Sequence, residues 1–542
     1  MLTVKQLNLQ HPEYKLYSEW WRRLDILYDE VLMKQHIPEF LTSRPKELPE
    51  IYEKRQEIFD YDNILSACLG FFRAALFKKS PSVTMVNIDE NGLPKGPVPK
   101  SQAAFYTFFR GNTDGAGGSF VSHLKDAFIS MALQGRVYTM IDIVKTDPNT
   151  TLLDQKRANL VDAKGKPSPR AMIVPVHSVI NWSVGRDGTY DWVVIHSVQT
   201  EQPTVLDEPV NYDVWTVLDR TNYTIYRRKK NTNGISNGAI SGLLTVLPSD
   251  GDSQVPELVD QGTHLCAAAR QVPLVRSDVT STLWLGKRVH YPVCAHLNQS
   301  NSLAWQLFMS NLAMPIITCD EEISPTVAEG GFIKLPANAT FKWSEPDGNS
   351  TQWSMQQKDS LREEVYRLMY LMYQGKQASA TGDGASGASK AQELEVALEA
   401  MNEFGDHIIA HGQSVLNMVA LARKEPDIRA DIRGLRFGRS ATLAQIQATE
   451  ATLSLDIPSI AFEKAVEADF AVAFFEDANA QLTDLIVSQI EAAPPRADRF
   501  IVAQKAQADA SAVAGEAGGK FNQPPKTKAP AESKVSPPAG NG

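Results

Sequence analysis

The chain has little of what marks a membrane protein, a secreted protein or a disulfide-stabilised one. No run reaches the ~18 uninterrupted apolar residues that a membrane-spanning helix needs. Its first ten residues, MLTVKQLNLQ, lack the basic region, apolar core and cleavage site of a secretory signal, so we expect synthesis in the cytoplasm. The four cysteines, Cys68, Cys266, Cys294 and Cys319, show no CxxC or Cys/His spacing, which argues against a structural zinc site or a disulfide framework.

Recognisable catalytic motifs are also missing. No GxSxG appears, and paired carboxylates such as Glu363 and Glu364 specify no acid and base. Gly382, Gly384 and Gly387 match GxGxxG, but the pattern before them predicts a helix where a dinucleotide-binding motif requires a strand. We therefore predict a protein that is not an enzyme and holds no cofactor and no metal.

One pair of histidines leaves an enzymatic alternative open. His407 and His411 stand four residues apart on one face of a predicted helix, a spacing that a metal could use. The glutamate of a zinc-protease motif is absent because Ile408 follows His407, and no third ligand is assigned. A metal-dependent hydrolase using this pair would be revealed by elemental analysis of the purified protein.

Length and charge limit the number of domains and the kinds of partner that the sequence allows. The chain has 542 residues, which at roughly 150 residues per domain suggests about three or four structural units. A formal charge of -9 gives no overall electrostatic footprint for tight nucleic-acid binding. A conduit past which DNA slides remains compatible with this charge, because a mildly repulsive lining does not trap the polymer.

Residue periodicity predicts an α+β protein. One helix is expected over 13–33, with Tyr17, Trp21, Leu24, Tyr28 and Val31 on one stripe, and another over 50–78, followed by a polar loop. A helix over 120–134 leads through Gly135 and Arg136 into a β-rich run at 137–143. Further strands are expected at 171–184, 190–199, 212–218 and 222–228, whereas 229–262 is expected to form surface loops.

The order of elements after residue 290 is the most informative feature. Helices are expected over 294–313 and 351–374, with a short strand-rich insert, 316–344, between them. A Gly/Ser-rich loop and a helix over 390–423 follow, and Gly405 and Gly412 fall on the packing seam of that helix, where they permit close approach or a kink. Residues 441–493 are helical in character, and 513–542 are expected to be disordered.

This order resembles the portal proteins of tailed bacteriophages over roughly residues 50–490. The matching pieces are the helix end Leu76–Pro81, the helix-to-strand step at Gly135–Arg136, the helix exit at Met314–Pro315 and the run Phe332–Pro336 in the insert. The resemblance implies a portal-type fold with a wing, a two-helix stem, a small β-containing clip, a long kinked helix and a C-terminal helical crown. By position these are wing 1–289, stem 290–314 and 350–374, clip 315–349, tunnel loop 375–389, long kinked helix and wing return 390–440, crown 441–512 and a disordered tail 513–542.

The same resemblance implies a passive function. The protein would form a ring, usually of twelve subunits, at one capsid vertex of a virion, after assembly in the host cytoplasm. Double-stranded DNA would be packaged and ejected through the ring without sequence-specific contacts. The terminase large subunit and head-to-tail adaptor proteins would dock on the clip, the major capsid protein would be a neighbour, and no membrane would be involved. Another virion structural or adaptor protein without a DNA channel is the main alternative.

Individual residues follow from this assignment. The predicted tunnel-loop residues are Lys376, Ser379, Gly382, Gly384, Gly387 and Lys390; the helix-kink residues are Gly405 and Gly412; the stem residues that pack between subunits are Leu303, Trp305, Leu307 and Phe308; and the clip docking residues are Phe332, Lys334 and Lys342. The glycines would give the loop freedom to move against DNA, and the two lysines that flank it could touch phosphates. Truncation of Trp305 or Leu307 is predicted to impair assembly, which sedimentation would detect.

Overall fold

The computed structural model divides the chain into two compact units, Met1–Gly438 and Arg439–Gly542. The structure describes residues 2–89, 94–142, 161–162, 165–202, 204–230, 255–310, 314–318, 340–344, 348–371, 387–435 and scattered positions between 462 and 492. In the second unit the described positions, among them 464–468 and 488–490, are helical. Most of the predicted crown and all of the predicted tail, 513–542, lie outside the described residues.

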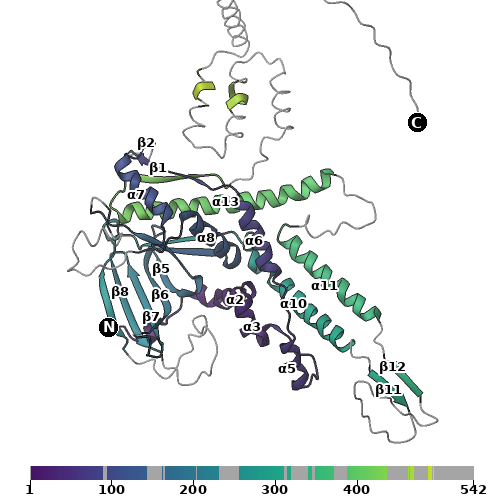
Figure 1. Ribbon diagram of the computed structural model, residues 1–542. Coiled ribbons are helices and arrows are strands. Elements are labelled where there is room, and N and C mark those ends of the chain that lie inside the picture. The colour runs from purple at the N-terminus through teal and green to yellow at the C-terminus, as the bar shows by residue number, and fades with distance from the viewer. Residues whose placement is uncertain are drawn as a thin grey trace, which may run out of the picture. The chain divides into compact units, whose positions relative to one another are not determined.

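The first unit mixes helices and antiparallel sheets, which confirms the α+β class (Figure 1). Its small sheets have the orders β10-β3-β4 and β13-β1-β2, and its large sheet has the order β5-β6-β7-β8-β9. The strands are β1 Ser82–Ile88, β2 Pro94–Pro97, β3 Arg136–Asp142, β4 Arg170–Val174, β5 Val179–Val184, β6 Tyr190–Glu201, β7 Val210–Asp219, β8 Asn222–Lys229, β9 Glu257–Thr263, β10 Leu274–Asp278 and β13 Ile428–Arg433. Its helices include α1 Val4–Leu7, α4 Ile37–Phe40 and α7 Lys100–Gly111.

The core is organised around the C-terminal end of helix α8, Phe120–Gln134. The last carbonyls of a helix have no partner within it. Here the indole of Trp284 donates to the carbonyl of Leu133 at 2.9 Å, and the indole of Trp21 donates to that of Gln134 at 2.9 Å. Gly135 then ends the helix in the left-handed conformation, with φ 80°, and leads directly into β3.

Two long predicted helices are each interrupted, because a side chain within the predicted range caps the start of a new helix. The predicted helix over 13–33 is α2, Pro12–Tyr28, followed by α3, Glu30–Gln35. Between them the carboxylate of Asp29 accepts the backbone N–H of Val31 at 2.7 Å, and the break leaves Val31 exposed rather than on the buried stripe. The predicted helix over 50–78 is likewise α5, Pro49–Glu57, and α6, Ile64–Leu76.

Several strand predictions are also corrected. The expected strand over 171–184 is two strands in different sheets, because the segment after Pro175 forms a 3-10 turn, Val176–Ser178, between β4 and β5. The expected loop after residue 80 contains β1, which pairs with β13, with Ser82 opposite Arg433. The expected surface loops at 229–262 contain most of β9, which pairs with β8.

Helix α10, Leu285–Ser310, begins well before its predicted start at 294 and runs through Pro292. Proline removes one helical N–H and disfavours a helix interior. Packing outweighs this cost, because Leu285, Val289, Val293 and Leu297 are all buried against the body of the unit. Gly286 allows this approach, since a Cβ there would overlap the backbone carbonyl oxygen of Leu133.

Helix α11, Gly348–Leu368, ends before the predicted limit at 374. Tyr370 takes a positive φ of 59°, and the N–H of Leu371 donates back to the carbonyl of Tyr366 at 2.8 Å. Such a left-handed residue with a backward hydrogen bond is a common helix terminator. Among the described residues, no helix is both long enough and apolar enough to span a membrane.

Candidate functional site

The candidate site is the antiparallel pair of helices α10 and α11, which projects from the sheets and helices of the first unit and carries a β-hairpin at its far end (Figure 1). At ~1.5 Å per residue the 26 residues of α10 span about 39 Å, so the pair is long enough to reach beyond the core. Between the two helices, Gln299 donates to the carbonyl of Ser354 at 3.4 Å, and the Ser354 hydroxyl donates to Gln306 at 3.3 Å.

Two asparagines fix the middle of α10 to the N-terminal segment. Asn298 accepts the N–H of Thr42 at 2.9 Å and donates to the carbonyl of Phe40 at 2.9 Å. One helical turn further, buried Asn301 accepts the N–H of Asp60 at 3.1 Å and donates to the carbonyl of the same residue at 3.2 Å. Each amide therefore binds both polar groups of a backbone segment, which sets the direction in which the pair leaves the core.

We expect Asn301→Leu to lower the free energy of unfolding by about 1–3 kcal/mol, because the backbone groups of Asp60 lose their buried partners. Gln299→Leu is the matched control on the same helix, since it removes one long hydrogen bond and should change stability by less than about 0.5 kcal/mol. Urea unfolding of both variants measures the difference. Equal midpoints would show that the asparagine does not anchor the helix.

The outer half of the helix pair presents apolar side chains to solvent. Leu307 and Phe308 on α10 and Met355 on α11 are each exposed by between 42 and 51%, and Trp353 is exposed by 73%. Trp305 is half-buried and packs on Phe308, with ring centroids 5.7 Å apart. These side chains form an exposed apolar surface that a soluble monomer rarely carries.

One of the four predicted stem residues does not belong to this surface. Leu303 is only 7% exposed, so it packs inside its own subunit and is not available to a neighbour. Conversely, Trp353 and Met355 were not among the predicted residues, although Trp353 is the most exposed large apolar side chain described on the pair. The sequence around them, Gln352 to Gln357, is mostly polar and shows no apolar stripe.

Strands β11, Met314–Thr318, and β12, Thr340–Ser344, form the hairpin. They pair antiparallel, with Met314 opposite Ser344 and Ile316 opposite Lys342. Of the predicted clip residues, Lys342 therefore has a position on β12, whereas Phe332 and Lys334 lie outside the described residues. The structure places a β unit between the two helices of the pair, as the order of sequence patterns predicts.

Helix α13, Gly387–Ala422, is the long helix that follows in the chain. Gly387 is its first residue and Lys390 lies in its first turn, so the last residues of the predicted 375–389 loop are helical. Lys376, Ser379, Gly382 and Gly384 lie outside the described residues. The element described before the glycine-rich motif is helix α11, which is not the strand that a dinucleotide-binding motif requires.

The two glycines predicted on the seam of α13 face strand β13 and its end. A Cβ on Gly405 would overlap the backbone carbonyl oxygen of Leu435, and a Cβ on Gly412 would lie 2.9 Å from the side chain of Ile432. The helix is continuous across both positions. Their evident structural role is to let α13 lie close against the returning chain.

His411 lies at the centre of a buried polar network and not at a metal site. Its Nε2 shares a hydrogen bond with the Thr139 hydroxyl at 3.0 Å, and its Nδ1 shares one with Ser277 at 2.9 Å. The same Thr139 hydroxyl is 3.1 Å from Nε2 of His123. Both ring nitrogens of His411 are thus occupied, and within the described ranges no group of three or more metal-ligating side chains forms.

The network joins α8, β3, β10 and α13, and it is built for neutral imidazoles. Burial lowers the pKa of His411 to about 3, aided by the neighbouring His123, and burial lowers the pKa of His123 to about 4, against the opposing charge of Asp114. The Thr139 hydroxyl can donate to one ring and accept from the other. If both imidazoles took up a second proton, each ring would become a cation that donates from both nitrogens. The Thr139 hydroxyl would then have no acceptor in the network, and two positive charges would lie side by side.

Acid should therefore destabilise the first unit. The folded-state pKa values lie below the ordinary value of 6.5, so the unfolded chain binds more protons as pH falls, and stability is complete only above pH 6.5. Between there and about pH 4, each histidine should remove about 1.4 kcal/mol per pH unit from the free energy of unfolding. Urea unfolding at a series of pH values across this range gives the slope of the unfolding free energy against pH. His411→Asn should reduce this slope by the amount that corresponds to about one proton. An unchanged slope would contradict the role of His411.

Comparison with known proteins gives no family. No protein-family model matches the chain, and no curated protein matches it. A chain from the neck of an empty GTA particle computed with C6 symmetry is similar at 10% identity over 75% of this chain and 90% of that chain, with a TM-score of 0.37. A chain from the virion of a native gene transfer agent (GTA) particle is similar at 10% identity over 81% of this chain and 99% of that chain, also with a TM-score of 0.37. At these scores, neither similarity establishes a shared fold.

Proposed function

We propose that this chain is a structural subunit of a phage-like particle, and specifically its portal protein. In this proposal twelve copies form a ring at one capsid vertex, and double-stranded DNA is packaged and ejected through the ring. The observation that carries the proposal is the projecting α10–α11 pair with hairpin β11–β12 at its far end, inserted in the chain between the sheet-rich part and α13. A compact monomeric enzyme has no evident use for this arrangement.

The exposed apolar surface of the pair supports assembly with other copies. Leu307, Phe308, Trp353 and Met355 are exposed on the part of the helix pair that lies beyond the anchoring asparagines Asn298 and Asn301 of α10. In a ring each subunit offers different surfaces to its two neighbours, and the contacts close by rotation. Helix pairs packed side by side around an axis would remove these side chains from water.

The proposed mechanism is passive. Residues 375–386 and the start of α13 would face the channel, where Lys376 and Lys390 could meet phosphates without reading bases. The ATP-driven motor would be a separate protein, the terminase large subunit, which would dock on the predicted clip, 315–349, through Phe332, Lys334 and Lys342. Head-to-tail adaptors would later occupy the same region, and the major capsid protein would surround the ring.

Negative-stain images of the purified full chain test this function. We expect closed rings with a central hole as wide as a DNA duplex. Closed particles with no hole, or a protein that stays monomeric at all concentrations, would contradict the portal and favour another virion structural or adaptor protein.

A further inference from the structure

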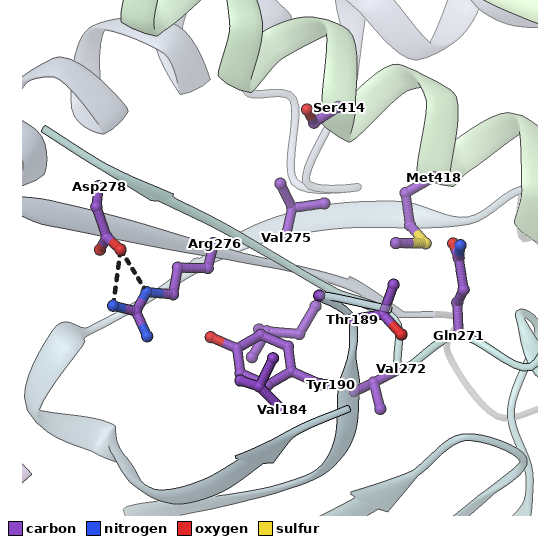
Figure 2. Close-up of a pocket in the computed structure, with 12 residues that line it drawn as sticks. Val184, Thr189, Tyr190, Gln271, Val272, Val275, Arg276, Asp278, Ser414 and Met418 are labelled. Carbon is purple, nitrogen blue, oxygen red and sulfur yellow. Dashed lines mark hydrogen bonds and ion pairs between the residues drawn. The ribbon is translucent and has the colours of Figure 1, made fainter. Parts of the chain in front are cut away.

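The buried side chain of His296 on α10 has no partner for its outer ring nitrogen. It is 2% exposed, and among the described residues nothing hydrogen-bonds to its Nε2 or to the Oγ of Ser300, one helical turn further. The cavity of about 430 Å³ beside β10 is different, because the charge of Arg276 in its wall is matched by Asp278 at 2.7 Å (Figure 2) and by Glu13 at 3.3 Å. His296 is therefore a buried titratable group whose protonation depends on neighbouring charges and not on a hydrogen bond at Nε2.

The imidazole of His296 faces the middle of α11. One turn further along α10, Gln299 donates to the carbonyl of Ser354 at 3.4 Å, which fixes the register of the two antiparallel helices. Because the helices run in opposite directions, three residues back on α10 correspond to the next turn forward on α11. His296 is therefore opposite the turn 358–362. The charged residues of this turn are Lys358, Asp359 and Arg362.

A negative neighbour of His296 is fixed to α10 itself. Asn301 of α10 accepts the N–H of Asp60 at 3.1 Å and donates to its carbonyl at 3.2 Å. Asp62, two residues later in the chain, carries the carboxylate that acts on the imidazole. Because Asp60 is tied to α10, this carboxylate stays near His296 even when α11 moves.

The positive neighbours lie on a part of α11 that is weakly held. Val365 and Met369 are fully buried and anchor the end of α11. We call residues 348–362 the outer segment. None of its described side chains is buried, and its described hydrogen bonds to α10 are long, at 3.3 and 3.4 Å. Lys358 and Arg362 are therefore on a segment that separates from α10 at lower cost than the anchored end.

We propose that His296 makes the contact between α10 and the outer segment sensitive to acid. A proton on the buried imidazole adds a positive charge beside Lys358 and Arg362. Asp359 offsets only one of these cations, because it is paired with Arg362 at 2.9 Å. Separation of the outer segment removes the cations and admits water, whereas Asp62 stays beside the ring. The inference concerns a single subunit, so it goes beyond the proposed ring and does not depend on it.

The direction of the effect follows from proton linkage. Burial lowers the pKa of His296. Among the neighbouring charges, Asp62 and Asp359 raise this pKa. Lys358 and Arg362 lower it, and the net pKa lies below the ordinary value of 6.5. An imidazole exposed by separation of the outer segment keeps a pKa near 6.5. The separated form therefore binds more protons as pH falls, so the contact is fully stable only above pH 6.5 and weakens below it.

Hydrogen exchange of the full chain, followed by mass spectrometry and corrected for the intrinsic effect of pH on exchange, tests the proposal. Between about pH 7.5 and 5.5 we expect the protection of the outer segment to fall, by at most about tenfold per pH unit for one proton. His296→Leu should abolish the fall, and His411→Asn should leave it in place. An equal fall in the wild type and in His296→Leu would overturn the proposal. The comparison holds with or without rings, so failure of the proposed function would leave this test intact.

Two charge variants test the same joint without changing the buried ring. Lys358→Gln removes a cation from the outer segment and should reduce the fall in protection. Asp62→Asn removes the anion on the fixed side and should increase it. The side chain of Lys358 is half-buried and that of Asp62 is exposed, so both variants should fold. Shifts in the same direction, or no shift in either variant, would contradict the proposed joint.

Discussion

A Phe308→Asp/Trp353→Asp double variant should remain a folded subunit and fail to form rings. Both side chains are exposed in the single chain, so their replacement removes little packing within the subunit. In the ring both would be buried between neighbouring helix pairs. Removing two such side chains costs about 3 kcal/mol or more at each interface, which corresponds to at least about a hundredfold weaker association.

Sedimentation velocity across a range of concentrations measures this effect, and circular dichroism checks that the subunit is folded. Leu303→Asp on the same helix is the contrasting control, because its buried side chain should make the subunit itself unstable. A double variant that forms rings at the wild-type concentration would show that the exposed surface of the helix pair is not an assembly surface.

Gly405→Ala should destabilise the first unit by about 2 kcal/mol. Alanine favours a helix by up to about 1 kcal/mol over glycine, which alone predicts stabilisation. Its Cβ would overlap the backbone oxygen of Leu435, however, and a backbone atom cannot move aside as the end of a side chain can. Overpacking of this kind costs about 1–3 kcal/mol, and here we expect about 3 kcal/mol because α13 or the end of β13 must shift. Subtracting the gain of about 1 kcal/mol in helix propensity leaves a net loss of about 2 kcal/mol.

Gly412→Ala on the same helix is the matched comparison. Its Cβ would meet the side-chain ends of Ile432 at 2.9 Å and Leu124 at 3.0 Å, which can rotate away. We therefore expect a change within about 1 kcal/mol of the wild type in urea unfolding, since the gain in helix propensity offsets the crowding. Equal effects of the two substitutions would contradict the close approach at Leu435.

The parts of the fold that the sequence predicts well are those with a local signal. Helix α8 and the step through Gly135 into β3 follow from periodicity and a helix-ending glycine. Strands β6, β7 and β8 follow from runs of β-branched and aromatic residues. The interruptions at Asp29 and Asn63 were missed because an apolar stripe continues across them, while the capping hydrogen bonds depend on a single side chain.

The pairing of β1 with β13 had no local signal to find. Residues 82–85 alternate between polar and apolar side chains, which is compatible with a strand, but the partner strand lies more than 300 residues later, so nothing near β1 indicates the pairing. The run of α10 through Pro292 was missed for a related reason. Local preference predicts a helix that starts after the proline, and only the distant surfaces around Leu133 make the longer helix favourable.

Residues of the candidate site were predictable to different degrees. The order of helix, β insert and helix is written in the sequence, and Trp305, Leu307 and Phe308 lie on the pair as expected. Burial is a tertiary property, so sequence spacing did not separate Leu303 from its exposed neighbours or find Trp353 in a polar stretch. The partners of His411 come from β3 and β10, far away in the chain, and the pair with His407 therefore suggested a metal.

A three-dimensional cryo-electron microscopy reconstruction of the purified full chain tests the central claim most directly. The account predicts a closed ring in which α10–α11 pairs of adjacent subunits pack side by side around a DNA-wide passage, with the β11–β12 hairpins at one end. A particle without a passage, or one in which the helix pairs make no contact with each other, would contradict it.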